Sequence, residues 1–209
     1  MLHLAIRYPN GKQFRQPAET ASKLRSASAK TSFSDRGMTL EQELNQSNAY
    51  YLNHDVAVIH KKPTPIQIVN VDYPKRSAAV IKEAYFKQAS TTDYNGVYRG
   101  NYIDFDAKET QNATSFPLHN FHEHQVEHMR QCIKHGGICF AIIKFVKLDQ
   151  IFLFKATDLF SYWDNMDATK GRKSIPLADI QKNGILIQYH IQPLIPYLEA
   201  VNQLIDLRP

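Results

Sequence analysis

Helical periodicity recurs along the chain after residue 38. The segment from Thr39 to Gln42 reads Thr-Leu-Glu-Gln and fits a capping box, in which two side chains satisfy backbone N–H groups at a helix start. A later apolar stripe ends before Gly136 and Gly137, which suit the left-handed backbone that follows many helices. Pro196 can open a last helix. The spacing predicts helices at about 40–52, 121–134, 157–164, 177–182 and after Pro196.

Apolar runs and one alternating segment predict strands between these helices. In residues 102–108, Ile103 and Phe105 fall on one face, and Asp104, Asp106 and Lys108 fall on the other. Strands are expected at about 56–59, 66–71, 102–108, 138–146, 151–154 and 185–189. Helices around a mixed central sheet place the chain in the α/β class.

The dipeptide Asn95-Gly96 is the strongest short hairpin signal in the chain. A type I′ turn needs positive φ at both central residues, and Asn-Gly supplies it at low cost. We therefore expect a turn at these two residues, between extended segments at 91–94 and 97–98. Asp93 would then lie across the hairpin from the strand that carries Asp106 and Lys108.

Composition indicates one globular domain with a basic N-terminal extension. The chain has 209 residues, no apolar run near the ~20 residues of a membrane helix, and only two cysteines. It lacks a secretory signal pattern, so we expect a cytoplasmic protein without a membrane partner. Residues 1–34 hold six Lys and Arg residues against one acid, which accounts for the net charge of +5. We expect a flexible basic arm over 1–36, either binding a polyanion or simply solvated, and a body over 37–209.

A second basic segment spans about 63–88. Lysine and arginine residues outnumber acids there, and Tyr85 and Phe86 are interleaved with them. Such aromatic side chains can stack on nucleic-acid bases. The alternative is an ordinary mixed surface whose aromatic side chains belong to the core.

The candidate chemistry is Asp93 followed by Asp106-Ala107-Lys108. Two carboxylates and an ammonium would converge if Asp93 lies across the hairpin. Carboxylates suit Mg²⁺, which can polarise a phosphodiester and lower the pKa of a bound water. Lys108 can orient that water or stabilise charge on the phosphorus oxygens. The alternative is a salt-bridge ladder on an exposed strand face.

Longer stretches make the chain similar to the RecU family of Holliday-junction resolvases, within the restriction-endonuclease-like nuclease superfamily. The matching segments lie at 7–12, 36–41, 57–65, 73–86, 90–96, 102–105, 107–110, 114–118 and 124–129. This resemblance implies a restriction-endonuclease-like mixed sheet flanked by helices, with a protruding stalk inserted at about 63–88.

The resemblance also implies a metal site. Asp93 and Asp106 would ligate Mg²⁺, or Mn²⁺ as a substitute, with Thr91 and Gln125 completing the ligand shell. Lys108 would stabilise the transition state. The family usually has Glu where this chain has Asp106, and the shorter side chain would move the metal or the backbone by about a bond length.

In this family, a homodimer places its stalks in the open centre of a four-way DNA junction and nicks two opposed strands during recombination and repair. The resemblance therefore implies junction DNA and a second protomer as partners, with recombinase and branch-migration proteins as further candidates. A catalytically weakened junction-binding protein and a duplex-specific nuclease are the alternatives. The expected DNA-binding residues are Arg7, Lys12, Lys75, Arg76, Lys82, Tyr85, Phe86 and Lys87.

Two further features have competing interpretations. Glu43 on the first helix could add an acid to the site, although an exposed helix position is the more ordinary role. His122, His124 and His128 suggest zinc because the last two lie one helical turn apart, but a clear third and fourth ligand are lacking. Proximity to DNA phosphates is the preferred interpretation for the histidines.

Overall fold

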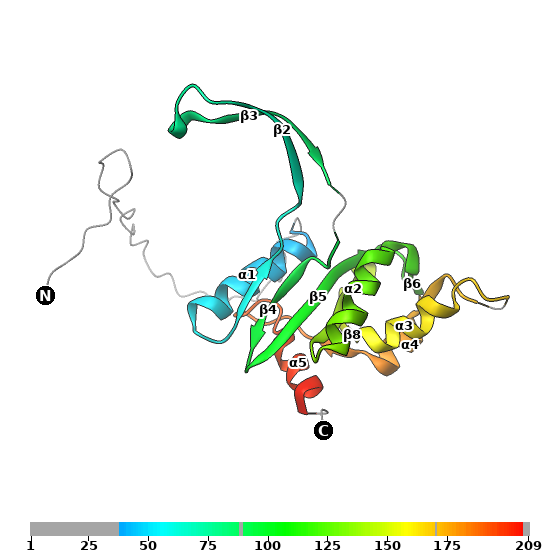
Figure 1. Cartoon of the computed structure of the whole chain (residues 1–209). Coiled ribbons are helices and arrows are strands. Elements are labelled where there is room, and N and C mark those ends of the chain that lie inside the picture. The colour runs from blue at the N-terminus through cyan, green and yellow to red at the C-terminus, as the bar shows by residue number, and fades with distance from the viewer. Residues whose placement is uncertain (1–37, 88–89, 170, 207–209) are drawn as a thin grey trace, which may run out of the picture. The chain divides into compact units, whose positions relative to one another are not determined.

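The computed structural model describes residues 38–87, 90–169 and 171–206 (Figure 1). The expected basic arm at 1–36, with Arg7 and Lys12, lies outside these residues. No helix within the described ranges is both long enough and apolar enough to span a membrane.

The centre of the fold is a six-stranded mixed sheet in the order β1-β4-β5-β7-β8-β10. β5 and β7 run parallel, and the other neighbouring pairs are antiparallel. Helix α2 connects β5 to β7, as a parallel crossover requires. The strands are β1 (Val58–Lys61), β4 (Tyr94–Tyr98), β5 (Asn101–Thr110), β7 (Ile138–Phe145), β8 (Gln150–Lys155) and β10 (Ile185–Ile187).

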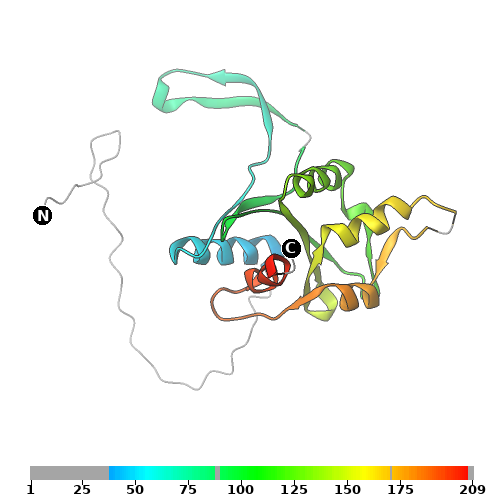
Figure 2. The same cartoon turned by 60° about the horizontal axis from the view of Figure 1, so that its bottom comes forward.

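Helices cover both faces of this sheet (Figure 2). On one face, α1 and α5 enclose a core that includes Phe105 and Phe140. On the other face, α2, α3 and α4 enclose a second core that includes Ala141 and Ile143. The helices are α1 (Leu40–Asn53), α2 (Glu123–Lys134), α3 (Ala156–Asn165), α4 (Leu177–Asn183) and α5 (Tyr197–Asp206). The expected α/β class, with helices flanking a mixed sheet, is confirmed.

The sequence correctly predicts the start of α1 and the alternation of β5. Thr39 accepts from the backbone N–H of Gln42, and the Gln42 side chain accepts from the backbone N–H of Thr39, which completes the capping box. In β5, Ile103 and Phe105 are fully buried in the α1-side core, whereas Asp104 and Asp106 are buried toward α2.

The turn expected at Asn95-Gly96 is wrong. Both residues lie inside β4, and the turn is at Arg99-Gly100, where φ is 49° and 75°. Gly96 pairs with Ile59 of β1, and a Cβ there would lie 2.1 Å from the Val58 carbonyl oxygen. The glycine therefore allows close approach of a neighbouring strand and does not form the turn.

A separate hairpin lies within the range expected for the stalk. It consists of β2 (Ile66–Asp72) and β3 (Val80–Phe86), with the short 3-10 helix η1 (Arg76–Ala78) between them (Figure 1). All side chains of the two strands are exposed except Val71, which is partly buried. A second small sheet pairs β6 (Ser115–Pro117) with β9 (Ser174–Pro176), and two further 3-10 helices are η2 (Leu118–Asn120) and η3 (Val146–Leu148).

Candidate active site

The β4–β5 hairpin brings Asp93, Asp106 and Lys108 together. Tyr94 pairs with Phe105, so continuing the antiparallel register by one residue places Asp93 opposite Asp106. Lys108 Nζ lies 3.1 Å from Asp106 Oδ2 and 3.7 Å from Asp93 Oδ2. Two carboxylates from adjacent strands thus share one ammonium.

The two carboxyl groups have very different environments. Burial, followed by the adjacent Asp93 carboxyl, raises the pKa of Asp106 well above its ordinary value. Burial also acts to raise the pKa of Asp93, but its interactions with Asp106 and Lys108 outweigh that effect and lower it. The Asp93 side chain is 40% exposed, whereas that of Asp106 is fully buried. Asp93 therefore carries the negative charge of the pair to a position that solvent can reach.

These groups fit a divalent cation. Both Asp106 oxygens are buried and meet no hydrogen-bonding partner among the described residues, and the Lys108 ammonium, 3.1 Å from Oδ2, is the cation beside them. A hard cation with oxygen ligands would neutralise the two acids together. The shorter side chain at position 106 still reaches Lys108, because its Oδ2 lies 3.1 Å from the ammonium.

The two other expected ligands have defined local partners. Gln125 lies in the first turn of α2 and is buried, and its Oε1 accepts from the His122 backbone N–H at 3.0 Å. An amide oxygen has two lone pairs, so this bond leaves one for a metal. The Thr91 hydroxyl donates to the Thr92 carbonyl at 3.2 Å. The ligand roles of Thr91 and Gln125 remain predictions.

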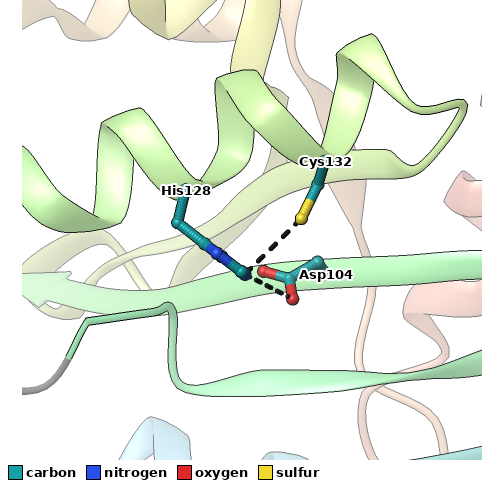
Figure 3. Close-up of side chains that lie close together, drawn as sticks. All are labelled: Asp104, His128 and Cys132. Carbon is teal, nitrogen blue, oxygen red and sulfur yellow. Dashed lines mark hydrogen bonds and ion pairs between the residues drawn. The ribbon is translucent and has the colours of Figure 1, made fainter.

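Asp104 is a buried polar residue for which the sequence motifs indicate no role. It lies two residues before Asp106 on the same face of β5 and is fully buried. Its carboxylate is close to His128 Nε2, which in turn lies 3.5 Å from Cys132 Sγ (Figure 3). The alternation of β5 already indicated that Asp104 faces the interior. A buried carboxylate needs hydrogen-bonding partners, so a structural role could have been expected from the sequence.

Glu43 does not join this site. Its carboxylate accepts from Lys144 Nζ at 2.8 and 3.0 Å and from the Tyr189 hydroxyl at 3.0 Å. Glu43 and Lys144 are each only 8% exposed and lie on the α1 face of the sheet, opposite the face of Asp106. The exposed-surface interpretation of Glu43 is therefore wrong as well, and the residue forms a buried ion pair.

The three histidines do not gather around a common point. The rings of His122 and His124 stack with centroids 5.4 Å apart, whereas His128 bonds to Asp104. Burial, followed by the charges of His122 and Lys108, lowers the pKa of His124. This arrangement gives no support to a three-histidine zinc site.

The hairpin residues expected to bind DNA are mostly at the surface. Tyr85 and Phe86 are 61% and 84% exposed, and Lys75 and Lys87 are exposed as well. Lys82 forms an ion pair with Asp72 at 2.8 Å. These positions leave two aromatic rings and several cations available to a partner, whereas Arg7 and Lys12 fall outside the described residues.

Comparisons with known proteins agree on one family. Residues 35–203 match the family model described as "Recombination protein U". The chain is 64% identical over 203 residues to the "Holliday junction resolvase RecU" of Lactiplantibacillus plantarum, covering 97% of each chain. It is 62% identical over 203 residues to proteins of the same name from Pediococcus pentosaceus and Levilactobacillus brevis, covering 97% of this chain and 99% and 100% of theirs.

Proposed function

The chain belongs to the RecU family, and on that basis we propose that it is an endodeoxyribonuclease that resolves Holliday junctions in homologous recombination. It is accordingly a phosphodiester hydrolase whose substrate is four-way junction DNA. The observation that supports this most strongly within the chain is the convergence of Asp93, Asp106 and Lys108 at one point of the sheet.

We further propose that Asp93 and Asp106 hold Mg²⁺, or Mn²⁺ as a substitute, with Thr91 and Gln125 as additional ligands. The bound cation would polarise the scissile phosphodiester and lower the pKa of an attacking water. Asp106 supplies a buried, fixed carboxylate, and Asp93 supplies a carboxylate that is open to substrate.

Lys108 would contribute a positive charge beside the reacting phosphate. Its side chain is 17% exposed and is held between the two carboxylates, so its ammonium has little freedom to move away. An ammonium fixed in advance stabilises charge that builds up on phosphorus oxygens without reorganising during the reaction. No covalent enzyme intermediate is required.

The substrate has two-fold character, so we propose a homodimer that nicks two opposed strands symmetrically. The β2–β3 hairpin would enter the junction centre, where Tyr85 and Phe86 meet unstacked bases and the lysines meet phosphates. The basic segment at 1–36 would add affinity that does not depend on sequence. We place this activity in the cytoplasm.

The test uses purified protein with a mobile four-way junction and a linear duplex of the same sequence, each with Mg²⁺ or with EDTA. The proposal predicts paired nicks in the junction only when Mg²⁺ is present. Binding without cleavage would indicate a junction-binding protein, and equal cleavage of the duplex would indicate a duplex nuclease. Either outcome would overturn the proposed function.

A further inference from the structure

Asp104 is the centre of a hydrogen-bonded cluster beneath the proposed active site. Its Oδ2 accepts from Lys62 Nζ at 2.8 Å and from the Tyr102 hydroxyl at 2.8 Å, and lies 3.1 Å from His128 Nε2. Its Oδ1 accepts from the Thr92 hydroxyl. Four donors from four segments of the chain therefore converge on one carboxylate that is fully buried.

The cluster is complete without a metal. Asp104, His128 and Cys132 lie close enough together for a metal to touch all three (Figure 3). However, the Lys62 ammonium already lies against the carboxylate, and a metal there would place a second cation next to it. Protein donors already occupy both carboxylate oxygens, so the geometry favours a structural role for Asp104.

Two of these donors lie in the two chain segments that connect the β2–β3 hairpin to the sheet, and one of these segments carries Asp93. Lys62 lies between β1 and the β2–β3 hairpin, and Thr92 lies between that hairpin and β4. Lys62 Nζ also donates to the Thr92 hydroxyl at 3.0 Å, and the Lys62 backbone N–H donates to the Asp93 carbonyl at 2.7 Å. Both chain segments that connect the hairpin to the sheet thus donate hydrogen bonds to Asp104, and the donor Thr92 is the residue next to Asp93.

A third donor fastens helix α2 to the same carboxylate. His128 lies three residues after Gln125, so the two side chains project from neighbouring positions on one side of the helix. Holding His128 against β5 restricts how far the first turn of α2 can move from Asp106. The cluster thereby spans the elements that carry Asp93, Asp106 and Gln125.

We propose that Asp104 is a positioning residue that holds the Asp93 segment and α2 in register with β5, so that the metal ligands are preorganised. This inference rests on the proposed function of Asp93 and Asp106 as metal ligands. Residues that orient metal ligands typically contribute 10–100-fold to metal affinity.

The primary test is Mn²⁺ binding measured by calorimetry in the absence of DNA. Asp104→Asn removes the carboxylate charge and leaves one acceptor oxygen where four donors meet, and we expect it to weaken Mn²⁺ binding about 10-fold. Lys62→Met removes one donor and keeps the other three, and we expect a smaller loss in the same direction. Hydrogen–deuterium exchange of residues 90–94 should become faster in both variants.

Tyr197→Phe is the matched control. Tyr197 is fully buried on the α1 side of the sheet and donates to Asn48, so its loss lowers the melting temperature without touching the Asp104 cluster. We expect this variant to bind Mn²⁺ like the wild type. A control that loses metal affinity as much as Asp104→Asn would show that general destabilisation causes the effect, and the proposal would be wrong.

Asp93→Asn separates the two possible failures. If Asp93→Asn binds Mn²⁺ and cleaves junctions like the wild type, the proposed site itself is wrong. If Asp93→Asn abolishes Mn²⁺ binding while Asp104→Asn and Lys62→Met bind it with wild-type affinity, only the positioning role is overturned.

Discussion

Replacing Asp106 with asparagine should make the metal-free protein more stable while abolishing its activity. The Asp106 carboxyl is fully buried, its oxygens make no hydrogen bond with described residues, and Lys108 at 3.1 Å is the cation beside it. Burying an ionised carboxylate costs several kcal/mol, which one partly shared ammonium offsets only in part. A neutral amide of nearly the same shape avoids this cost and can donate to Asp93.

The expected gain is about 1–2 kcal/mol at neutral pH. For a domain of this size, each kcal/mol shifts the melting temperature by about 2–4 °C, so the Asp106→Asn variant should melt about 2–8 °C higher in EDTA.

The sign of the pH dependence follows from the raised pKa of Asp106. The folded state holds the proton of Asp106 more tightly than the unfolded chain does. The free energy of unfolding of the wild type therefore falls as the pH rises from the pKa of the unfolded carboxyl, about 3.9, toward the raised pKa of the folded state. The difference between the two proteins should therefore vanish in acid.

Thermal unfolding followed by circular dichroism, in EDTA and in Mg²⁺, measures both effects. Mg²⁺ at ten times its dissociation constant should stabilise the wild type by about 1.4 kcal/mol and leave Asp106→Asn unchanged. The reasoning fails if the variant is less stable than the wild type in EDTA at neutral pH. It also fails if Mg²⁺ stabilises the two proteins equally.

Three further variants test the fold and the DNA-binding surface. Gly96→Ala should destabilise by about 3 kcal/mol or more in urea unfolding, because its Cβ would lie 2.1 Å from a β1 carbonyl oxygen; wild-type stability would contradict the close approach. Glu43→Ala should cost about 3–5 kcal/mol by leaving the Lys144 ammonium buried and unpaired, yet the folded variant should cleave normally; a selective loss of cleavage would return Glu43 to the active site. Tyr85→Ala with Phe86→Ala should reduce the preference for junctions over duplexes in binding assays without lowering the melting temperature, since both rings are exposed; equal weakening on both substrates would refute a stacking role.

Local patterns in the sequence predicted most of the body of the fold. The Thr39–Gln42 capping box and the alternation of residues 102–108 were correct, because backbone satisfaction and pleating act over a few residues. The turn predicted at Asn95-Gly96 was wrong because glycine is favoured both in turns and where two strands approach closely. Only the position of the neighbouring strand distinguishes these two uses of a glycine. Here β1 lies against Gly96, and the turn falls at Arg99-Gly100 instead.

The candidate site was predictable only in part for the same reason. Strand alternation placed Asp106 and Lys108 on one face, and the antiparallel partner brought Asp93 opposite them, as expected. The buried ion pair of Glu43 with Lys144 joins residues 101 positions apart, so the spacing of residues along one helix cannot predict it. Asp104 likewise accepts hydrogen bonds from four segments of the chain. The alternation of residues 102–108 indicated that Asp104 is buried, but it could not predict which residues donate to it.

The cleavage rate of Asp93→Asn on a four-way junction is the decisive measurement for the proposed active site. The substitution removes one charge from the proposed metal site and leaves the basic and aromatic side chains of the β2–β3 hairpin unchanged. Under single-turnover conditions with saturating Mg²⁺, we expect the rate to fall by about 100-fold or more, while the junction dissociation constant measured in EDTA stays within a few-fold of wild type. A rate close to that of the wild type would contradict the assignment of Asp93, Asp106 and Lys108 as the active site.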